Sequence, residues 1–305
     1  MPDAIAHYKL LDRIGTGGLG ELYRARDSKF GRTAAVRLLP AGVVADSERL
    51  NRLLTAARRA AELSHPNIAA LFDVGDASNP YLASEFVPGE LLRTKLAGRP
   101  LDVRRAVDFV IQLADALAEA EGQGLVHGDI RAATIIITPK DRPKLLHFGL
   151  SAFTTSGSAR PEAAAAARSK DDASSADQDA RIDIRALGWV MYEMLTGRAA
   201  ERGEGTEPSL PAVISRTLPP EIDAVIRKMV SKDPDKGYQT AATVAADLRA
   251  VAAILDARSA AVEAAPDSRR DSLRSLQPMA IAVLLAVLAF LAVWIWRSGG
   301  WHLSG

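Results

Sequence analysis

Two short segments near the middle of the chain constrain its fold and chemistry more than any other part of the sequence. The first is His127-Gly-Asp129-Ile-Arg131-Ala-Ala-Thr134, and the second, His147-Phe148-Gly149, begins twenty residues after the first begins. Asp129 is a carboxylate, a side chain that can act as a general acid or base when a loop holds it in place. The two segments therefore predict a pair of functional loops at fixed places in a larger fold.

A glycine-rich turn, Gly15-Thr-Gly-Gly-Leu-Gly20, lies between two predicted strands, Tyr8–Ile14 and Glu21–Arg26. A G-x-G-x-x-G pattern alone is weak, because dinucleotide-binding folds share it. In those folds a helix follows the glycines, whereas here a strand follows, which favours a flap over phosphate groups. Glycines let backbone amides approach a phosphate closely. A plain flexible hairpin turn is the alternative.

Further segments follow in the order found in one protein family. They are Ala34-Ala-Val-Arg37, His65-Pro-Asn-Ile68, Tyr81–Gly89, Asp183–Gly188 with Tyr192–Gly197, and Lys232-Asp-Pro234 with Tyr238-Gln239. Together with the glycine-rich turn and the two loops, they resemble the eukaryotic-type Ser/Thr protein kinases in their bacterial, membrane-anchored form. The resemblance implies an α+β, two-lobed fold over residues 8–255. A β-rich N-lobe with one helix would cover about residues 8–87, and a larger helical C-lobe about residues 88–255.

The resemblance also implies a nucleotide site between the lobes. In the catalytic loop Asp129 holds the base position, and Arg131 replaces the lysine that meets the γ-phosphate. Asp183 would cap the backbone around His127, and His127 would pack against Phe148. The residues implied for ATP binding are Gly15, Gly17, Gly20, Arg37, Glu85 and Val87, with Ser84 as gatekeeper.

Several positions depart from the family pattern. The two magnesium-binding positions are Thr134 instead of Asn and His147 instead of Asp. A hydroxyl and an imidazole make a poor magnesium site, so we expect magnesium not to be held strongly. Arg37 replaces the strand lysine, a change that is not conservative at a fitted site. Its glutamate partner falls at Ala56, so Arg37 is expected to lack a carboxylate.

Other losses are also paired. Where the family has an arginine before the catalytic Asp, this chain has Gly128. The positions of the activation-segment glutamate motif are Ser169-Lys-Asp171, and the position of the arginine that anchors the glutamate is Gly237. The chain between Gly197 and Pro219 is short, so the substrate-docking helix is expected to be reduced or missing.

Three functional readings remain open. The first is a pseudokinase that binds an active kinase or another cytoplasmic signalling protein, with ATP as a possible structural ligand. The second is a divergent, active Ser/Thr kinase with Asp129 as base and with Arg37 and Arg131 supplying positive charge. The third is a decayed protein without a present function.

The helical pattern predicts helices at Ser47–Leu63, with Ser47 as N-cap, and at Ile182–Leu195, Pro220–Val230 and Thr240–Leu255. Two segments, Thr154–Gln178 and Ala257–Gln277, have compositions that predict loosely held structure. Thr154, Thr155, Ser156 and Ser158 would make an acceptor segment for another kinase, although such residues are common in any loop.

The run Met279–Trp296 is 18 residues long, apolar and free of charge. As a helix it would be roughly 27 Å long, close to the hydrocarbon thickness of a bilayer. Three arginines precede it and only Arg297 follows, which predicts a cytoplasmic N-terminal domain. We therefore expect a single-pass cell-membrane protein, with a linker at 256–277, a span at 278–297 and a short extracytoplasmic tail at 298–305.

Composition excludes some other classes. The chain has no cysteine, which excludes disulfides, thiolate catalysis and Cys-ligated zinc. Its formal net charge is +1, so no overall field favours nucleic acid, and no nucleic-acid partner is expected.

Overall fold

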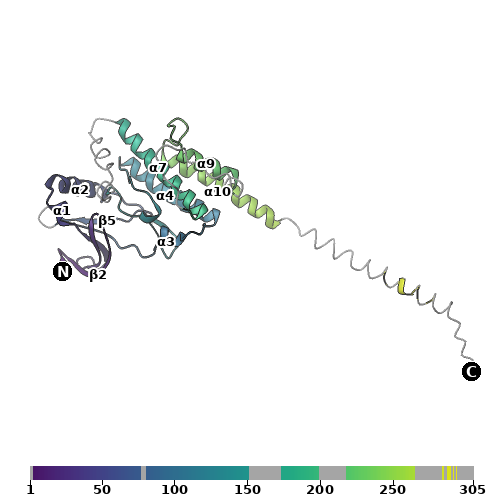
Figure 1. Cartoon of the computed structure of the whole chain (residues 1–305), viewed down its shortest axis with the longest axis horizontal. Coiled ribbons are helices and arrows are strands. Elements are labelled where there is room, and N and C mark those ends of the chain that lie inside the picture. Colours follow the sequence, from purple (N-terminus) through teal and green to yellow (C-terminus); the bar gives the residue numbers. More distant parts are fainter. Residues whose placement is uncertain are drawn as a thin grey trace, which may run out of the picture. The chain divides into compact units, whose positions relative to one another are not determined.

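An antiparallel sheet of six strands forms the N-terminal part of the protein (Figure 1). The computed structural model describes residues 3–76, 80–150, 173–198 and 218–264, with a few separate residues between 284 and 293. The strand order is β1-β2-β3-β4-β6-β5, with bounds β1 Ala4–Ile5, β2 Tyr8–Gly17, β3 Gly20–Asp27, β4 Thr33–Leu38, β5 Leu71–Val74 and β6 Tyr81–Glu85. The predicted glycine-rich turn joins β2 to β3, where Gly17 faces Gly20.

Two helices, α1 (Ala41–Val44) and α2 (Ser47–Ala60), follow β4, and α2 packs against β5. The apolar stripe of α2 is buried, as its spacing predicts. The prediction of Ser47 as N-cap is wrong by one residue. Asp46 caps the helix, because its backbone is extended and its carboxylate accepts a hydrogen bond from the Arg49 N–H at 3.0 Å.

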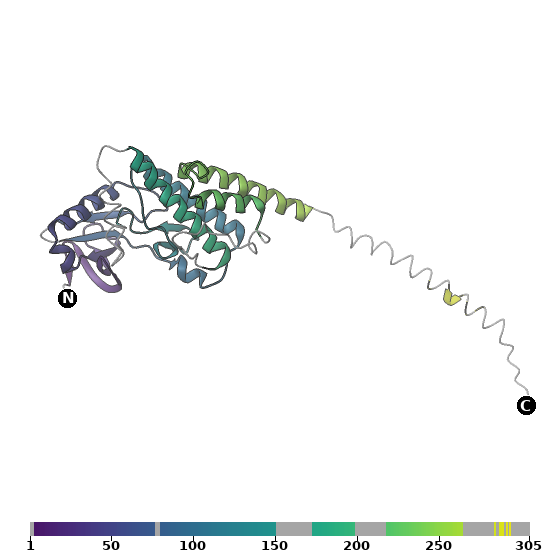
Figure 2. The same cartoon turned by 45° about the horizontal axis from the view of Figure 1, so that its top comes forward.

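The C-terminal part is mainly helical and carries a small second sheet (Figures 1 and 2). That sheet consists of β7 Glu90–Leu91, β8 Ile135–Ile137 and β9 Pro143–Leu145. The helical elements are α3 Leu92–Leu96, α4 Val103–Gly122, η1 Ala132–Thr134, α7 Ala173–Thr196, α9 Pro220–Val230 and α10 Ala241–Ala264. Helix α7 packs against both α4 and α9, so it forms the centre of this part.

Two predictions of loosely held structure are partly wrong. Helix α7 begins at Ala173, so Ala173–Gln178 is helical, and the rest of the predicted segment, 154–172, lies outside the described residues. Helix α10 continues to Ala264, so residues 257–264 are helical as well. Residues 257–264 are half alanine, the residue with the highest helix propensity. The positions 169–171 and the predicted short connection at 199–217 also lie outside the described residues.

The chain divides by internal contacts into two units, Met1–Ala253 and Ile254–Gly305. Within the part that the structure describes, no helix is long and apolar enough to cross a membrane. The predicted span Met279–Trp296 falls almost entirely outside that part, so it remains a prediction.

Gly188 of α7 is expected to be sensitive to substitution. A Cβ atom there would lie 2.8 Å from Met229 Cβ and 2.9 Å from Val230 Cγ1 of α9. We expect Gly188→Ala to lower the free energy of unfolding by about 1–3 kcal/mol through overpacking. The matched control is Gly122→Ala at the end of α4, where nothing lies within 4 Å. Urea unfolding should place this control within about 1 kcal/mol of the wild type; equal effects of both variants would contradict the described packing.

Candidate functional site

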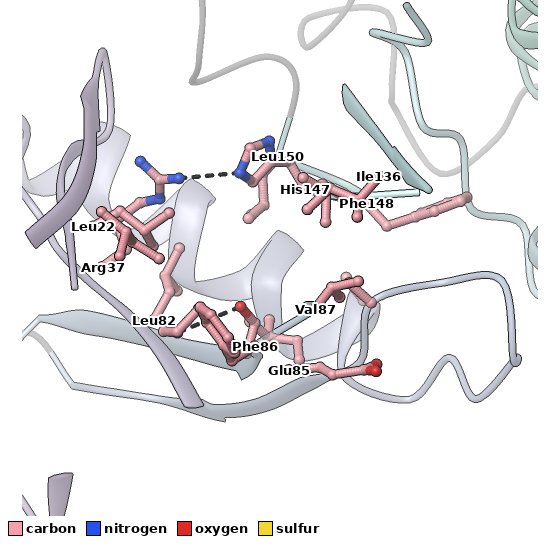
Figure 3. A pocket seen from close by; sticks show the side chains of 17 residues that line it. Leu22, Arg37, Leu82, Glu85, Phe86, Val87, Ile136, His147, Phe148 and Leu150 are labelled. Atoms are coloured by element: carbon pink, nitrogen blue, oxygen red, sulfur yellow. Dashed lines mark hydrogen bonds between the residues drawn. The ribbon is translucent and has the colours of Figure 1, made fainter. Parts of the chain in front are cut away.

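An apolar pocket lies between the six-stranded sheet and the small second sheet (Figure 3). Its walls come from the strands β2, β3, β4, β5, β6 and β8, from α2 and from the segments after β6 and β9. Among the described residues that line it, only Arg37 and Glu85 are charged. The remaining lining includes Leu22, Ala35, Leu71, Leu82, Val87, Ile136, Phe148 and Leu150. An apolar cavity with a few convergent polar groups is the usual form of a small-molecule site.

The glycine-rich turn is anchored to the protein by the residue between its last two glycines. Leu19 is only 1% exposed and belongs to a core cluster with Leu53, Leu82 and Leu150. Gly20 has φ +92°, and a Cβ atom there would lie 2.0 Å from the Leu38 carbonyl oxygen. Glycine is therefore required at this position for steric reasons as well as for the conformation.

Arg37, on β4, reaches across the pocket to the segment after β9. Its Nη2 atom donates a hydrogen bond of 3.0 Å to His147 Nε2, and its Nη1 atom lies 3.5 Å from the Gly20 carbonyl oxygen. Figure 3 shows the guanidinium and the imidazole facing each other. Burial lowers the pKa of Arg37, and no carboxylate among the described residues forms an ion pair with it. That Arg37 lacks a carboxylate partner in the whole chain stays a prediction, because residues 151–172 and 199–217 lie outside the described part.

His147 is held as a neutral ring. Burial, and then the Arg37 charge, lower its pKa to about 3. Since Nε2 accepts from Arg37, the ring proton is assigned to Nδ1. The backbone of His147 has φ +61°, a left-handed conformation that histidine adopts more readily than most residues. Gly149, two residues after His147, lies against α2, where an added Cβ would come within 3.3 Å of Ala60 Cβ.

The loop at His127 is organised by a buried carboxylate. Asp183, on α7, accepts hydrogen bonds from the His127 N–H at 2.6 Å and from the Gly128 N–H at 2.7 Å. The His127 ring is fully buried and packs edge-to-face on Phe148, with ring centroids 5.1 Å apart. Its Nε2 lies 2.8 Å from the Leu146 carbonyl oxygen. Both predicted roles, the cap by Asp183 and the packing of His127 on Phe148, are confirmed.

Asp129, Arg131 and Thr134 contact one another within the loop before β8. Arg131 Nε lies 3.0 Å from Asp129 Oδ1, so the base position is ion-paired. The Thr134 hydroxyl lies 2.9 Å from the Asp129 carbonyl oxygen and accepts the Arg131 N–H at 3.1 Å. Thr134 is 3% exposed. Its hydroxyl therefore braces the loop backbone.

The segment after β6 presents groups for a planar ring. Among the described residues, nothing accepts a hydrogen bond from the Val87 N–H, and Val87 lines the pocket. Glu85 forms an ion pair with Lys144 of β9, with 2.7 Å between Nζ and Oε2. In Figure 3 the Glu85 carboxylate points away from Arg37. Ser84 also lines the pocket, and its hydroxyl lies 3.4 Å from the Ala35 carbonyl oxygen.

The structure gathers only some of the predicted site residues around the pocket. Arg37, Glu85, Val87 and His147 line it. Gly15, Gly17 and Gly20 form the neighbouring turn, whereas Asp129, Arg131 and Thr134 belong to the loop before β8. Sequence reasoning missed the anchoring of Leu19 and the ion pair of Lys144. Neither residue has a periodic or motif signal, and only the fold brings them to their partners.

A magnesium ion does not fit the residues at the two expected positions. The Thr134 hydroxyl binds backbone groups, and His147 Nε2 accepts a hydrogen bond from the Arg37 guanidinium. Magnesium prefers oxygen ligands in an octahedral arrangement. An adenine ring does fit, because the pocket is apolar and the Val87 amide lies at its wall.

The fold and the pocket are those of a protein kinase, and comparison with known proteins agrees. Residues 8–245 match the family described as protein kinase domain, so the chain belongs to the protein kinases. It is of the bacterial Ser/Thr type, and the two-lobed fold predicted from the sequence is confirmed.

The similar proteins are bacterial kinases. The chain is 34% identical over 265 residues to a probable serine/threonine-protein kinase of Streptomyces coelicolor, covering 80% of this chain and 39% of that protein. It is 33% identical over 263 residues to serine/threonine-protein kinase PknB of Mycolicibacterium smegmatis, covering 79% and 42%. The crystal structure of the PknI kinase domain of Mycobacterium tuberculosis aligns with a TM-score of 0.65 and 26% identity, covering 81% of this chain and 96% of that one. The chain spans about two fifths of the length of these two curated relatives.

Stability is expected to fall in mild acid because of His127. Burial lowers the pKa of His127 to about 4, whereas an unfolded histidine has a pKa of about 6.5. Between about pH 6.5 and pH 4 the unfolded chain therefore binds more protons at His127 than the folded protein does. As the pH falls through this range, His127 lowers the free energy of unfolding by up to about 1.4 kcal/mol per pH unit. Urea unfolding at about pH 7, 6 and 5 should show a smaller slope for His127→Gln than for the wild type. Identical slopes would contradict the neutral, buried ring.

Proposed function

We propose that this protein is a catalytically impaired kinase, a pseudokinase, that acts in signalling by binding other proteins. The observation that carries the proposal is the hydrogen bond between Arg37 and His147. A position that binds magnesium in the family is therefore occupied here by His147, a neutral ring that accepts a hydrogen bond from the Arg37 cation. Kinase catalysis consists mostly of positioning and of neutralising charge around the γ-phosphate with metal ions. Without a metal site, that neutralisation is lost.

The retained features support binding. Membership of the kinase family implies ATP binding, and the apolar pocket, with a Val87 amide that has no acceptor among the described residues, supports a site for the adenine ring. Asp183 holds the loop around His127 through two hydrogen bonds, so the fold of this loop is maintained although the two metal-binding positions are substituted. This argues against a decayed protein, because a buried, satisfied network of this kind stabilises one defined structure.

The partner that we propose is an active kinase or another cytoplasmic signalling protein. The relatives are named as Ser/Thr kinases, and a kinase-shaped protein without transfer acts through its surface and through the state of its cleft. Thr154, Thr155, Ser156 and Ser158 remain the proposed acceptor segment for such a kinase.

Membrane anchoring through residues 279–296 is part of the proposal. Its support is the uncharged apolar run and the arginines before it. Cells expressing the full chain should retain it in the membrane fraction after alkaline washing, whereas a chain ending at Ala264 should be released. Release of both forms would contradict the anchor.

A divergent active kinase is the second candidate, and the retained Asp129 favours it. The test is transfer of labelled γ-phosphate from ATP to the full chain itself and to added protein, with Mg²⁺ and with Mn²⁺. We expect incorporation equal to that of Asp129→Asn. Incorporation that is lost in Asp129→Asn would establish an enzyme and overturn the pseudokinase proposal.

A further inference from the structure

We propose that the cleft recognises a metal-free nucleotide polyphosphate, and that magnesium weakens this binding. The inference rests on the proposed function, because it assumes that the cleft binds a nucleotide without transferring its phosphate. It concerns the chemical form of the ligand, which in a catalytic kinase would be the magnesium complex.

The first observation is a buried cation that forms no ion pair with any residue in the described part of the chain. Arg37 is 9% exposed and lines the pocket. Its contacts are His147 Nε2 at 3.0 Å and the Gly20 carbonyl oxygen at 3.5 Å, both uncharged acceptors. Burial is the cause of its lowered pKa, with no contribution from an acidic neighbour. Leaving a buried charge without a partner is strongly unfavourable, so this position favours an anion.

The second observation is that the other charges near the pocket are already paired. Asp129 pairs with Arg131 at 3.0 Å, and Glu85 pairs with Lys144 at 2.7 Å. Within the described residues, Arg37 therefore supplies the uncompensated positive charge of the pocket wall. A guanidinium has five N–H donors, and the two contacts use two of them. Donors thus remain for the oxygens of a phosphate group.

The third observation explains why magnesium should oppose binding. The ion would bring two positive charges close to Arg37, and none of the residues that the structure describes places a carboxylate on Arg37 to balance them. The Thr134 hydroxyl and His147 Nε2 are engaged with protein groups and supply no ligand. Magnesium bound to the phosphates would also neutralise the charge that Arg37 recognises. The metal complex therefore loses attraction to the protein and gains no protein oxygen ligand in return.

The apolar half of the pocket makes the ligand a nucleotide rather than inorganic polyphosphate. Leu22, Leu82 and Ile136 line the pocket together with Val87, whose N–H is unpaired among the described residues. These groups suit a planar ring with an acceptor at its edge. Both the ring and the phosphates should therefore contribute to affinity.

The test is the dissociation constant of the full chain, in detergent micelles, for three probes: ATP, adenosine and inorganic tripolyphosphate. Isothermal titration is run in EDTA and again with excess Mg²⁺. In EDTA we expect ATP to bind about tenfold or more tighter than adenosine or tripolyphosphate, the effect of one charged hydrogen-bonded contact. Excess Mg²⁺ should weaken ATP binding and leave adenosine binding unchanged.

Arg37→Gln provides the second arm, because glutamine keeps a donor and removes the charge. In this variant ATP should bind no tighter than adenosine, and the magnesium effect should disappear. The matched control is Arg24→Gln on β3, whose side chain is 46% exposed and pairs with Asp12 on the surface. It should behave as the wild type. Because the wild-type comparison needs no substitution, a failure of Arg37→Gln to fold leaves the test intact.

Two results would overturn the inference: ATP binding that is no tighter than adenosine binding in EDTA, or ATP binding that is tightened by Mg²⁺. Neither result would by itself establish an enzyme. Labelled phosphate transfer, measured on the same sample, separates a failure of this inference from a failure of the proposed function.

Discussion

Replacing Asp183 with alanine is expected to lower the free energy of unfolding by about 3–5 kcal/mol, because it removes a buried charged acceptor from two backbone donors. The His127 and Gly128 amides, now bound at 2.6 and 2.7 Å, would lose their partner. Each buried, unpaired amide costs about 1–3 kcal/mol. Urea unfolding of the full chain, followed by circular dichroism, measures the change.

Two further variants show whether the effect belongs to this contact. Asp183→Asn keeps one acceptor oxygen and should lose less than the alanine variant. Asp12→Ala removes a carboxylate whose side chain is 51% exposed and which pairs with Arg24, so it should change stability by about 1 kcal/mol or less. If Asp183→Ala lowered the free energy of unfolding no more than Asp12→Ala does, the loop at His127 would not depend on its hydrogen bonds to Asp183.

The double substitution His147→Asp with Thr134→Asn is expected to reverse the effect of magnesium on ATP binding. The carboxylate would replace the ring that now accepts from Arg37, and the amide oxygen would replace a hydroxyl that now binds the loop backbone. Together they supply oxygen ligands of the kind that magnesium prefers. Magnesium should then tighten ATP binding by about tenfold or more. Isothermal titration in EDTA and in Mg²⁺ measures this.

The matched control for the double variant is His147→Asn. Asparagine tolerates the left-handed backbone conformation at this position but brings no charge. It should not create a magnesium dependence. A double variant that also lacked one would show that the missing ligands are not the main defect of the cleft.

The fold could be predicted because its signals are local and ordered. Glycines between two strands, the loop at His127 and the segment His147-Phe148-Gly149 stand in the order and at the spacing of a kinase. The sequence also states directly that the position of the helix glutamate, which lies on α2, is Ala56. These inferences depend on which residue occupies a position, and the sequence states that directly.

The contacts that replace the lost ones could not be predicted. That Arg37 binds His147, 110 positions away, depends on how the sheet and the segment after β9 approach each other. That Leu19 is buried beside Leu150 depends on the path of the glycine-rich turn. The late end of α10 was missed because alanine-rich sequence suits both helices and loosely held segments. The early start of α7 was missed because its first six residues include two serines and an aspartate, which are common in loops.

A single-turnover assay, with the full chain in excess over γ-labelled ATP in Mg²⁺ and in Mn²⁺, decides whether the cleft performs phosphoryl transfer. It measures the rate at which labelled phosphate is transferred from ATP to protein or released into water. We expect the same rate for the wild type, for Asp129→Asn and for buffer alone. A wild-type rate that exceeds both others and needs Asp129 would show that the cleft performs phosphoryl transfer, and would contradict the assignment as a pseudokinase.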